Sequence, residues 1–394
     1  MKRRFLYFLL ICSLVFALSS CHEDSPEPVT ESTRTVFVYM PWSTDLLSAF
    51  EQNLEDLKTA ISEMGGLKDE RLIVFLSSST TSASLFEITY QNGTCSQKQI
   101  KQYTNPSNVS LSGLTQLLTE VRTYAPAKSY SMIIGCHGMG WVPVYATDTK
   151  TTTDTKTLLS SPTGTPRYLT RWFGAYGNKA CQTEISTLRQ AMELADFHTD
   201  YLLFDDCYMS NIEVAYELKD VTSYLIASPC EIMASGMPYK KIGKYLFGTP
   251  DYGKICEEFH TFYSTYAIPC GTLAVTDCSQ LDQLADVVRT IHSRYTFDET
   301  YRKDIQVMDG YSPALFFDFA DYFGKFNLDA DLQEQLATAL ADAVPYKVNT
   351  PYTYSQLKNG FITLRTYSGL TISEPSINPS AAKYKQTSWY ITTH

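Results

Sequence analysis

Short apolar runs alternate with amphipathic stretches over most of the chain. Runs of about five apolar residues, the length of a buried strand, occur at 36–40, 72–76, 130–136, 201–204, 224–228 and 272–276. Between them, apolar residues recur every three or four positions, as on a helix that packs by one face, at 43–64, 111–124, 184–197 and 209–218. This alternation predicts an α/β fold built on a mostly parallel sheet.

Turn and cap residues add detail to this pattern. Ser43 or Thr44 is expected to cap the first helix, and Gly65-Gly66 to end it. Asn92-Gly93 predicts a tight turn after an exposed strand at 85–90. Beyond residue 240 the pattern is more helical, with helices expected at 251–266, 278–295, 312–323 and 331–344 and short strands at 361–364 and 370–372.

The first residues read as a targeting segment. Residues 2–4 are basic and residues 5–18 are apolar, a stretch too short to span a bilayer comfortably. Residues 1–20 are therefore predicted to be a signal peptide that takes no part in the fold.

The end of this segment, Leu18-Ser19-Ser20-Cys21, resembles the lipobox of bacterial lipoproteins. The resemblance implies cleavage before Cys21, a lipid on its thiol, and a location in the bacterial cell envelope, at the outer membrane or cell surface. An ordinary signal peptide followed by a chance cysteine is the alternative. Residues 21–33 are polar and contain prolines, which predicts a tether to a domain at 34–394.

Composition limits the function classes. Among 394 residues, 44% are hydrophobic and 19% charged, which indicates a globular protein. The net charge of -10 argues against nucleic acid as a partner. There are 10 cysteines but no CxxC pair, so a zinc site of that type is not expected.

Two of the predicted strands end in residues that suit nucleophilic catalysis. One run leads into His137-Gly138, and the other into Asp205-Asp206-Cys207. Ends of parallel strands meet at one edge of a sheet, so the thiol and the imidazole are expected to meet there. A helix is expected to start directly after Cys207, where its N–H groups would favour a thiolate. The backbone N–H groups of Gly138 and Cys207 are candidates to hold an oxyanion.

Residue types alone do not settle this interpretation. A cysteine at a strand end is more often a packed small side chain than a nucleophile, and a lone histidine is more often structural. The other histidines are weaker candidates, because His198, His260 and His292 lie in or near predicted helices and His394 ends the sequence. No metal ligand is expected among the site residues.

The sequence motifs around His137 and Cys207 are more specific than the residue types alone. Residues 135–141, GCHGMGW, closely resemble the H-G-x-G-W block of clostripain-family cysteine peptidases, and residues 204–218 resemble that family's F-D-x-C-x-M-x-x-x-E-x-A-x-E-L block. The resemblance implies a caspase-like α/β/α sandwich around a mostly parallel sheet, with added C-terminal helices. It also implies a catalytic dyad of His137 and Cys207 acting on proteins or peptides.

The same family typically cleaves after Arg or Lys, using carboxylates in its specificity pocket. Asp205 lies two residues before the cysteine and would share its face of the strand; the alternative is an acid that caps a helix or bonds a loop. The segment 229–239 departs from the family pattern by lacking a Pro-Gly and a Trp. A second pocket group would be Glu231, or Ser235 in its place, and Cys230 or Met237 in the pocket would favour a residue other than Arg or Lys.

The sequence also bears on activation by cleavage and on the need for a cofactor. The polar loop at 147–180 contains Lys150 and Lys156, and some relatives are activated by a cut between the two blocks, so self-cleavage is expected there. No cofactor is expected; some relatives need calcium, but no EF-hand-like loop occurs, so a calcium requirement stays open. The leading hypothesis is an exported cysteine endopeptidase. The alternatives are a surface lipoprotein that binds without cleaving, and a different thiol hydrolase or transpeptidase on the same fold.

Overall fold

Side chains of the central strands alternate between two hydrophobic cores. In the first strand, Phe37 and Tyr39 enter one core, while Val36, Val38 and Met40 enter the other. This period of two is what a strand covered on both faces requires. The computed structural model describes residues 31–41, 45–143, 174 and 181–394, of which Ser32–His394 form one unit.

In these described residues, nine strands form one sheet in the order β10-β8-β7-β6-β5-β1-β2-β3-β4. The five neighbours β7, β6, β5, β1 and β2 run parallel. The strands on both flanks, β3 with β4 and β8 with β10, are antiparallel. The bounds are β1 Ser32–Met40, β2 Glu70–Ser79, β3 Ser82–Gln91, β4 Thr94–Thr104, β5 Ala127–Ile134, β6 Thr199–Phe204, β7 Thr222–Ala227, β8 Thr272–Asp277 and β10 Tyr346–Asn349.

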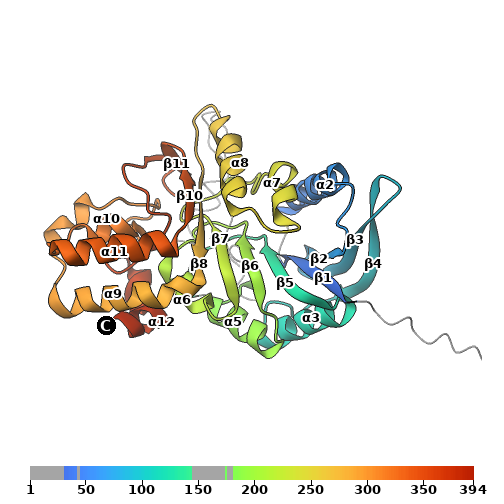
Figure 1. The fold of residues 1–394 in the computed structure, drawn as a ribbon, viewed down its shortest axis with the longest axis horizontal. Helices are drawn as coiled ribbons and strands as arrows, with labels where there is room; N and C mark the ends of the chain where they lie inside the picture. The colour runs from blue at the N-terminus through green and yellow to red at the C-terminus, as the bar shows by residue number, and fades with distance from the viewer. Residues whose placement is uncertain (1–30, 42–44, 144–173, 175–180) are drawn as a thin grey trace, which may run out of the picture. The chain divides into compact units, whose positions relative to one another are not determined.

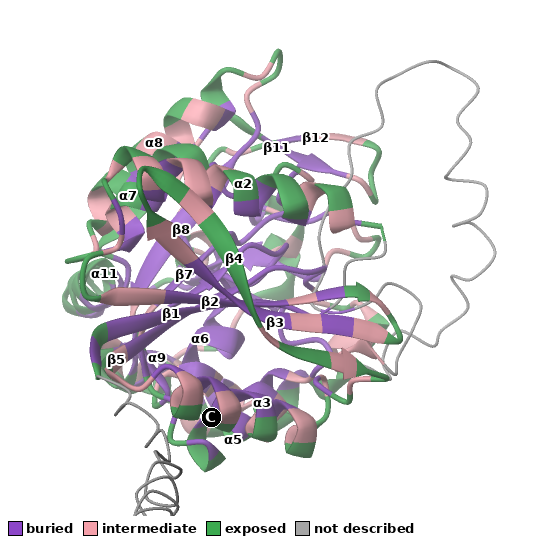
Figure 2. Cartoon of the chain, turned by 90° about the vertical axis from the view of Figure 1, so that its right-hand side faces the viewer, coloured by how far each residue is buried: buried purple, intermediate pink, exposed green. Residues whose placement is uncertain are grey.

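Helices cover both faces of this sheet (Figure 1). Helices α2, α7 and α8 pack on one face, and α3, α5 and α6 on the other, while α9 packs against α11 and α12. The bounds are α2 Leu47–Glu63, α3 Leu111–Tyr124, α5 Ile185–Leu194, α6 Ile212–Leu218, α7 Tyr239–Leu246, α8 Tyr252–Ser264, α9 Leu281–Arg294, α10 Phe319–Phe323, α11 Ala330–Ala343 and α12 Ser388–Thr393. The central strands are buried, whereas β4 is largely exposed (Figure 2).

Two small strand pairs and three short 3-10 helices lie in the C-terminal part of the unit. Strand β11 pairs with β12, and β13 pairs with β9, both antiparallel. The bounds are β9 Phe317–Asp318, β11 Tyr352–Ser355, β12 Gly360–Thr363, β13 Thr371–Ile372, and for the 3-10 helices Cys278–Gln280, Glu299–Asp304 and Pro379–Gln386.

The predicted fold class is confirmed: helices flank both faces of a sheet whose central strands are parallel, with further helices near the C-terminus. The turn at Asn92-Gly93 is also confirmed, since both residues have positive φ and join β3 to β4. The predicted helix at 312–323 is mostly wrong. Only Phe319–Phe323 is helical, and Phe317–Asp318 form a strand with β13 instead.

The start of the first helix also differs from the prediction. Ser43 and Thr44 lie outside the described residues, and α2 begins at Leu47 with Leu46 in the cap position and no capping hydrogen bond from its side chain. The predicted loop at 147–180 lies outside the described residues apart from Gly174. In the part of the chain that the structure describes, no helix combines the length and hydropathy needed to cross a bilayer.

Candidate active site

Four loops meet at the carboxyl edge of the parallel strands. The register pairs Tyr39 of β1 with Ile134 of β5, Ile134 with Phe204 of β6, and Leu203 of β6 with Ile226 of β7. These strands therefore end at the same edge, where open α/β sheets place their binding sites. Beyond the strand ends the chain delivers, in this order, Asp45, His137, Cys207 and Ile232.

The loop after β5 lies directly against the loop that carries Cys207. A Cβ atom on Gly138 would stand 2.3 Å from the carbonyl oxygen of Cys207 and 3.0 Å from its amide nitrogen. The neighbouring amide of Cys136 donates to Asp206 Oδ1 at 2.6 Å and fixes the two loops together. Glycine is therefore required at position 138 by close approach of two backbones, and the predicted meeting of the two segments is observed.

The next glycine of the same block is required for a second reason. Gly140 has φ +62°, and a Cβ atom there would lie 2.5 Å from Asn211 Nδ2 and 2.9 Å from the carbonyl oxygen of Tyr208. Tyr208 itself adopts φ +59°, an uncommon left-handed conformation for a bulky residue. The chain thus turns sharply after Cys207, and Gly140 packs into that turn.

His137 is buried, with 4% of its surface exposed. Its Nε2 lies 2.7 Å from Asp45 Oδ2. A carboxylate accepts hydrogen bonds, so Nε2 carries the proton in the neutral ring and Nδ1 carries the lone pair. Nδ1 is buried and has no hydrogen-bond partner. The ring is therefore oriented through one nitrogen, and the other remains available to exchange a proton.

Asp45 is the residue of this group that the sequence analysis missed. Partial burial alone would raise its pKa, but the hydrogen bond and charge of His137 outweigh burial and hold that pKa below its usual range. The signal that could have identified it is its place directly after the first buried strand, at the same edge as the other two loops. It was hidden because its neighbours Leu46 and Leu47 continue the amphipathic pattern.

The side chain of Cys207 has no exposed surface. Its Sγ accepts a hydrogen bond from the amide of Ile232 at 3.3 Å. The expected helix start beside this thiol is wrong, because α6 begins only at Ile212 and its cap is Asn211, whose side chain accepts from the amide of Val214. Tyr208 and Met209 are buried but not helical, so their apolar character mimicked a first helical turn.

Asp205 is also fully buried at the end of β6. Its Oδ1 accepts from the amide of Met237 at 2.9 Å, and its Oδ2 accepts from the hydroxyl of Tyr239 at 3.1 Å. Both partners belong to the segment 229–239 that departs from the family pattern. In this arrangement Asp205 bonds a loop, which was the alternative to a pocket role.

The other two predicted pocket residues lie in the same segment but face different neighbours. Glu231 accepts from the hydroxyl of Tyr208 at 2.5 Å, from Ser355 Oγ at 2.7 Å and from the amide of Gln356 at 2.9 Å. Ser235 Oγ pairs with the hydroxyl of Tyr266 at 2.6 Å. Glu231 thus joins the Cys207 loop to β11, while Ser235 lies on the exposed side of the segment.

The remaining residues of the two blocks connect the site to the C-terminal segment. Trp141 Nε1 donates to Ser373 Oγ at 2.9 Å, and the amide of Ser373 donates to Glu213 Oε1 at 2.8 Å. Burial raises the pKa of Glu213 to about 8, against the opposing effect of that hydrogen bond. Glu217 accepts from Arg189 and from Ser388. Both glutamates therefore link α6 to other parts of the fold.

The described residues also contain side chains that could bind a metal ion. One cluster with suitable spacing occurs among them, His292, Glu374 and His394, and it does not include His137 or Cys207. It lies between α9, α12 and the segment after β13.

Known proteins with a similar fold are cysteine proteases. The family model described as the clostripain family (Peptidase C11) matches residues 163–339. A crystal structure of a secreted C11 cysteine protease from Bacteroides thetaiotaomicron, named iotapain, is 45% identical, covers 93% of this chain and 100% of its own, and superimposes with a TM-score of 0.84. No match was found among curated protein sequences.

Two further crystal structures are similar. A clostripain from Bacteroides thetaiotaomicron, in complex with the peptide inhibitor BTN-VLTK-AOMK, is 50% identical over 57% of this chain and 99% of its own, with a TM-score of 0.55. An inactive zymogen C11 protease from Parabacteroides distasonis is 27% identical over 93% of this chain and 99% of its own, with a TM-score of 0.74.

Proposed function

Because the chain belongs to the clostripain (C11) family of cysteine peptidases, we propose that it cleaves peptide bonds with Cys207 as nucleophile and His137 as general acid and base. The observation that carries this proposal is the contact of Gly138 with the Cys207 backbone, together with the His137 ring that Asp45 holds by one nitrogen only. The buried Nδ1 of His137 is the atom that takes the thiol proton.

The reaction follows from these groups. The Cys207 sulfur attacks the scissile carbonyl carbon, and His137 gives its proton to the leaving amine, which leaves an acyl-enzyme thioester. His137 then takes a proton from a water molecule that attacks the thioester, and the thiol is released with the acid product. The backbone of Gly138 packs against that of Cys207, and the amides of these two residues are the proposed donors to the oxyanion.

For specificity, we propose that Asp205 selects a basic residue before the cut, with Glu231 or Ser235 as a second pocket group. A buried carboxylate would pair strongly with a Lys or Arg side chain. The inhibitor bound to the clostripain relative has a peptide part, VLTK, that ends in lysine. In this chain Asp205 is bonded to Met237 and Tyr239, so a substrate side chain has to replace or share those bonds.

Activation is proposed to follow self-cleavage within 147–180. The intact chain holds Cys207 fully buried under the amide of Ile232, which is a closed arrangement of the nucleophile. A relative of similar fold is described as an inactive zymogen. A cut between the two blocks would free the loops at the strand ends to open.

The proposed location is the bacterial cell envelope, with cleavage after residue 20 and a lipid on Cys21. One relative, which matches 93% of this chain, is described as secreted. Calcium is not needed by the proposed chemistry, because the dyad supplies both the nucleophile and the proton transfers.

The decisive experiment is cleavage of a peptide library by the wild-type protein and by Cys207→Ala, with product ends read by mass spectrometry. Cys95→Ala is the matched control. This cysteine lies on the edge strand β4, outside the candidate site, and its thiol donates to the carbonyl oxygen of Lys58. We expect cuts after Lys or Arg that vanish only in Cys207→Ala, and a wild-type chain nicked within 147–180.

Other outcomes would change the proposal in defined ways. Cuts after other residues would keep the dyad and discard the basic pocket. Cleavage of esters without cleavage of peptides would indicate another thiol hydrolase. Binding of peptides with no cleavage that depends on Cys207 would indicate a binding module, and an unnicked active chain would remove the activation step.

A further inference from the structure

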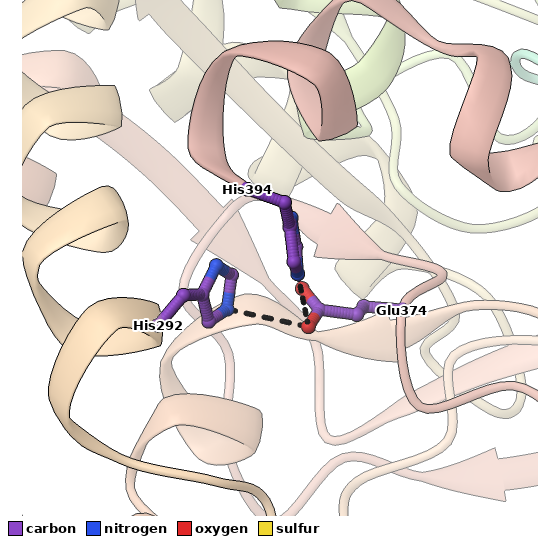
Figure 3. A group of neighbouring side chains, drawn as sticks. All are labelled: His292, Glu374 and His394. Carbon is purple, nitrogen blue, oxygen red and sulfur yellow. Dashed lines mark ion pairs between the residues drawn. The ribbon is translucent and has the colours of Figure 1, made fainter.

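Two histidines and a glutamate converge at a place that the proposed reaction does not use (Figure 3). His292 comes from α9, Glu374 from the segment after β13, and His394 from the residue after α12. The Nε2 atoms of His292 and His394 lie 3.2 Å and 3.3 Å from the same oxygen, Oε1 of Glu374. The three ligand atoms all lie within 4.8 Å of one another.

The Nδ1 atom of each ring lies within hydrogen-bond distance of a backbone carbonyl oxygen, and this contact determines which ring nitrogen carries the proton. His292 Nδ1 lies 3.1 Å from the carbonyl oxygen of Thr393, which can only accept, so Nδ1 carries hydrogen. His394 Nδ1 lies 3.3 Å from the carbonyl oxygen of Tyr390. The nearby Thr393 hydroxyl donates to Trp389 instead. In their neutral forms both rings therefore direct an Nε2 lone pair toward Glu374.

This arrangement is the one that histidine ligands of metals adopt. Such ligands almost always donate their second ring N–H to a carbonyl or carboxylate, which orients the ring. Without a cation, two lone pairs would face a carboxylate oxygen and repel it. His292 Nε2 is buried and makes no well-aligned hydrogen bond, and the side chain of His292 is only 9% exposed.

A pair of protonated rings is the competing explanation. The two imidazole rings lie 4.1 Å apart between centroids, so two positive charges would be stacked on one negative charge. Their surroundings are aromatic rather than acidic: Phe323 contacts His292, and Tyr390 stacks on His394 at 3.9 Å.

We propose that His292, Glu374 and His394 bind one Zn²⁺ ion. Two ligands at about 2.0–2.1 Å from a tetrahedral ion stand about 3.3 Å apart, which matches both nitrogen–oxygen distances. Two imidazoles and a carboxylate are a ligand set that zinc prefers, with a water molecule in the fourth position. The ion would join α9, α12 and the segment after β13.

The test uses the Cys207→Ala protein, which cannot bind zinc through the proposed dyad or cut itself. After removal of metals, the protein is dialysed against Zn²⁺, and bound metal is measured by mass spectrometry. We expect one zinc per chain, and binding weaker by at least about tenfold in His394→Ala and Glu374→Gln, since even the loss of a residue that only orients a ligand weakens metal sites by this factor. His198→Ala, at an exposed histidine before β6, is the matched control and is expected to bind like the parent.

The visible absorption of bound Co²⁺ is a second measurement, and it reports the geometry of the site and not the total amount of metal. Co²⁺ in the same site is expected to give the strong visible absorption of a tetrahedral complex, and His394→Ala is expected to lose it. Circular dichroism confirms that each variant is folded. Zinc content that is equal in all folded variants would assign the metal to the thiols and overturn the proposal, as would a parent protein that takes up no zinc.

Discussion

The strand-end site (Asp45, His137, Gly138 and Cys207) and the C-terminal brace (Ser373, Glu374, Trp389 and His394) are held together in different ways. In the site, backbone lies against backbone, with no room for a single Cβ atom between Gly138 and Cys207. In the brace, contacts run through side chains, such as Trp141 to Ser373. A close approach of backbones fixes atoms within a few tenths of an ångström, whereas side-chain contacts can relax. We therefore expect small changes in the site to lower activity, and small changes in the brace to lower only stability.

The largest effect is expected from Gly138→Ala. The added methyl group would stand 2.3 Å from the Cys207 carbonyl oxygen, so the two loops must separate and the proposed oxyanion donors lose their alignment. Loss of one such donor costs about 100-fold or more in kcat, and kcat/KM on a peptide substrate measures it. Gly135→Ala is the control, because a Cβ there meets only side-chain atoms at ordinary contact distances, one of Phe50 at 3.4 Å and two of Met40 at 3.6 Å and 3.7 Å. Equal activity of the two variants would contradict the backbone argument.

A change in pH tests the brace through Glu213, whose carboxyl accepts a hydrogen bond from the amide of Ser373. Its pKa is raised to about 8 by burial, so the folded state keeps a proton that the unfolded chain loses near its ordinary pKa of 4.5. Stability from this group is present below pH 4.5 and is lost as pH rises toward 8. Between pH 5.5 and 8 the loss is about 3 kcal/mol at roughly 1.4 kcal/mol per unit.

Urea unfolding at the two pH values measures this loss. Glu213→Gln keeps an acceptor for the Ser373 amide but removes the titration, so its free energy of unfolding is expected to fall less between pH 5.5 and 8. Glu193→Gln, at an exposed position of α5, is the control. If the free energy of unfolding decreases equally between pH 5.5 and 8 in the wild type and in Glu213→Gln, the decrease arises from other titrating groups.

A smaller effect is expected from Asp45→Asn. The amide still accepts from His137 but no longer stabilises the ring when it carries a positive charge during the reaction. Because Asp45 is half exposed, we expect a decrease in kcat of about tenfold and little change in melting temperature. Glu51→Gln, an exposed carboxylate on α2, controls for lost negative charge. An unchanged kcat would remove Asp45 from the positioning of the ring.

The smallest effect is expected from the hydrogen bond between Trp141 and Ser373. Trp141→Phe and Ser373→Ala should each lower the free energy of unfolding by about 1 kcal/mol, with activity largely retained. In the double variant the two losses should not add, because each removes the same hydrogen bond. Additive losses, or an activity as low as that of Gly138→Ala, would erase the difference between brace and site.

Sequence reasoning predicted the part of the site that follows from strand order. His137 and Cys207 each follow an apolar run, and parallel strands bring such ends together whatever their separation in sequence. It missed Asp45 because an acid inside an amphipathic pattern looks like the polar face of a helix. It missed β4 because Thr94–Thr104 is mostly exposed and polar, and such an edge strand is recognised only through its pairing with β3.

The errors around Cys207 have a similar origin. Tyr208 and Met209 are buried by the turn that follows the strand, so their apolar character says nothing about helix. The bonds of Asp205 to Met237 and Tyr239 depend on how the segment 229–239 folds back. No local pattern encodes that contact, since it spans more than 30 residues.

The order of the strands also has a consequence for synthesis of the chain. Asp45 and His137 are 92 residues apart, Cys136 and Asp206 are 70 apart, and Ile232 covers Cys207 from 25 residues further on. Contacts between residues so far apart in sequence form slowly, because the chain between them must first be brought together. The proposed catalytic residues are therefore not expected to come together on a growing or partly folded chain. The enzyme would then stay inactive on the ribosome until the central sheet has formed.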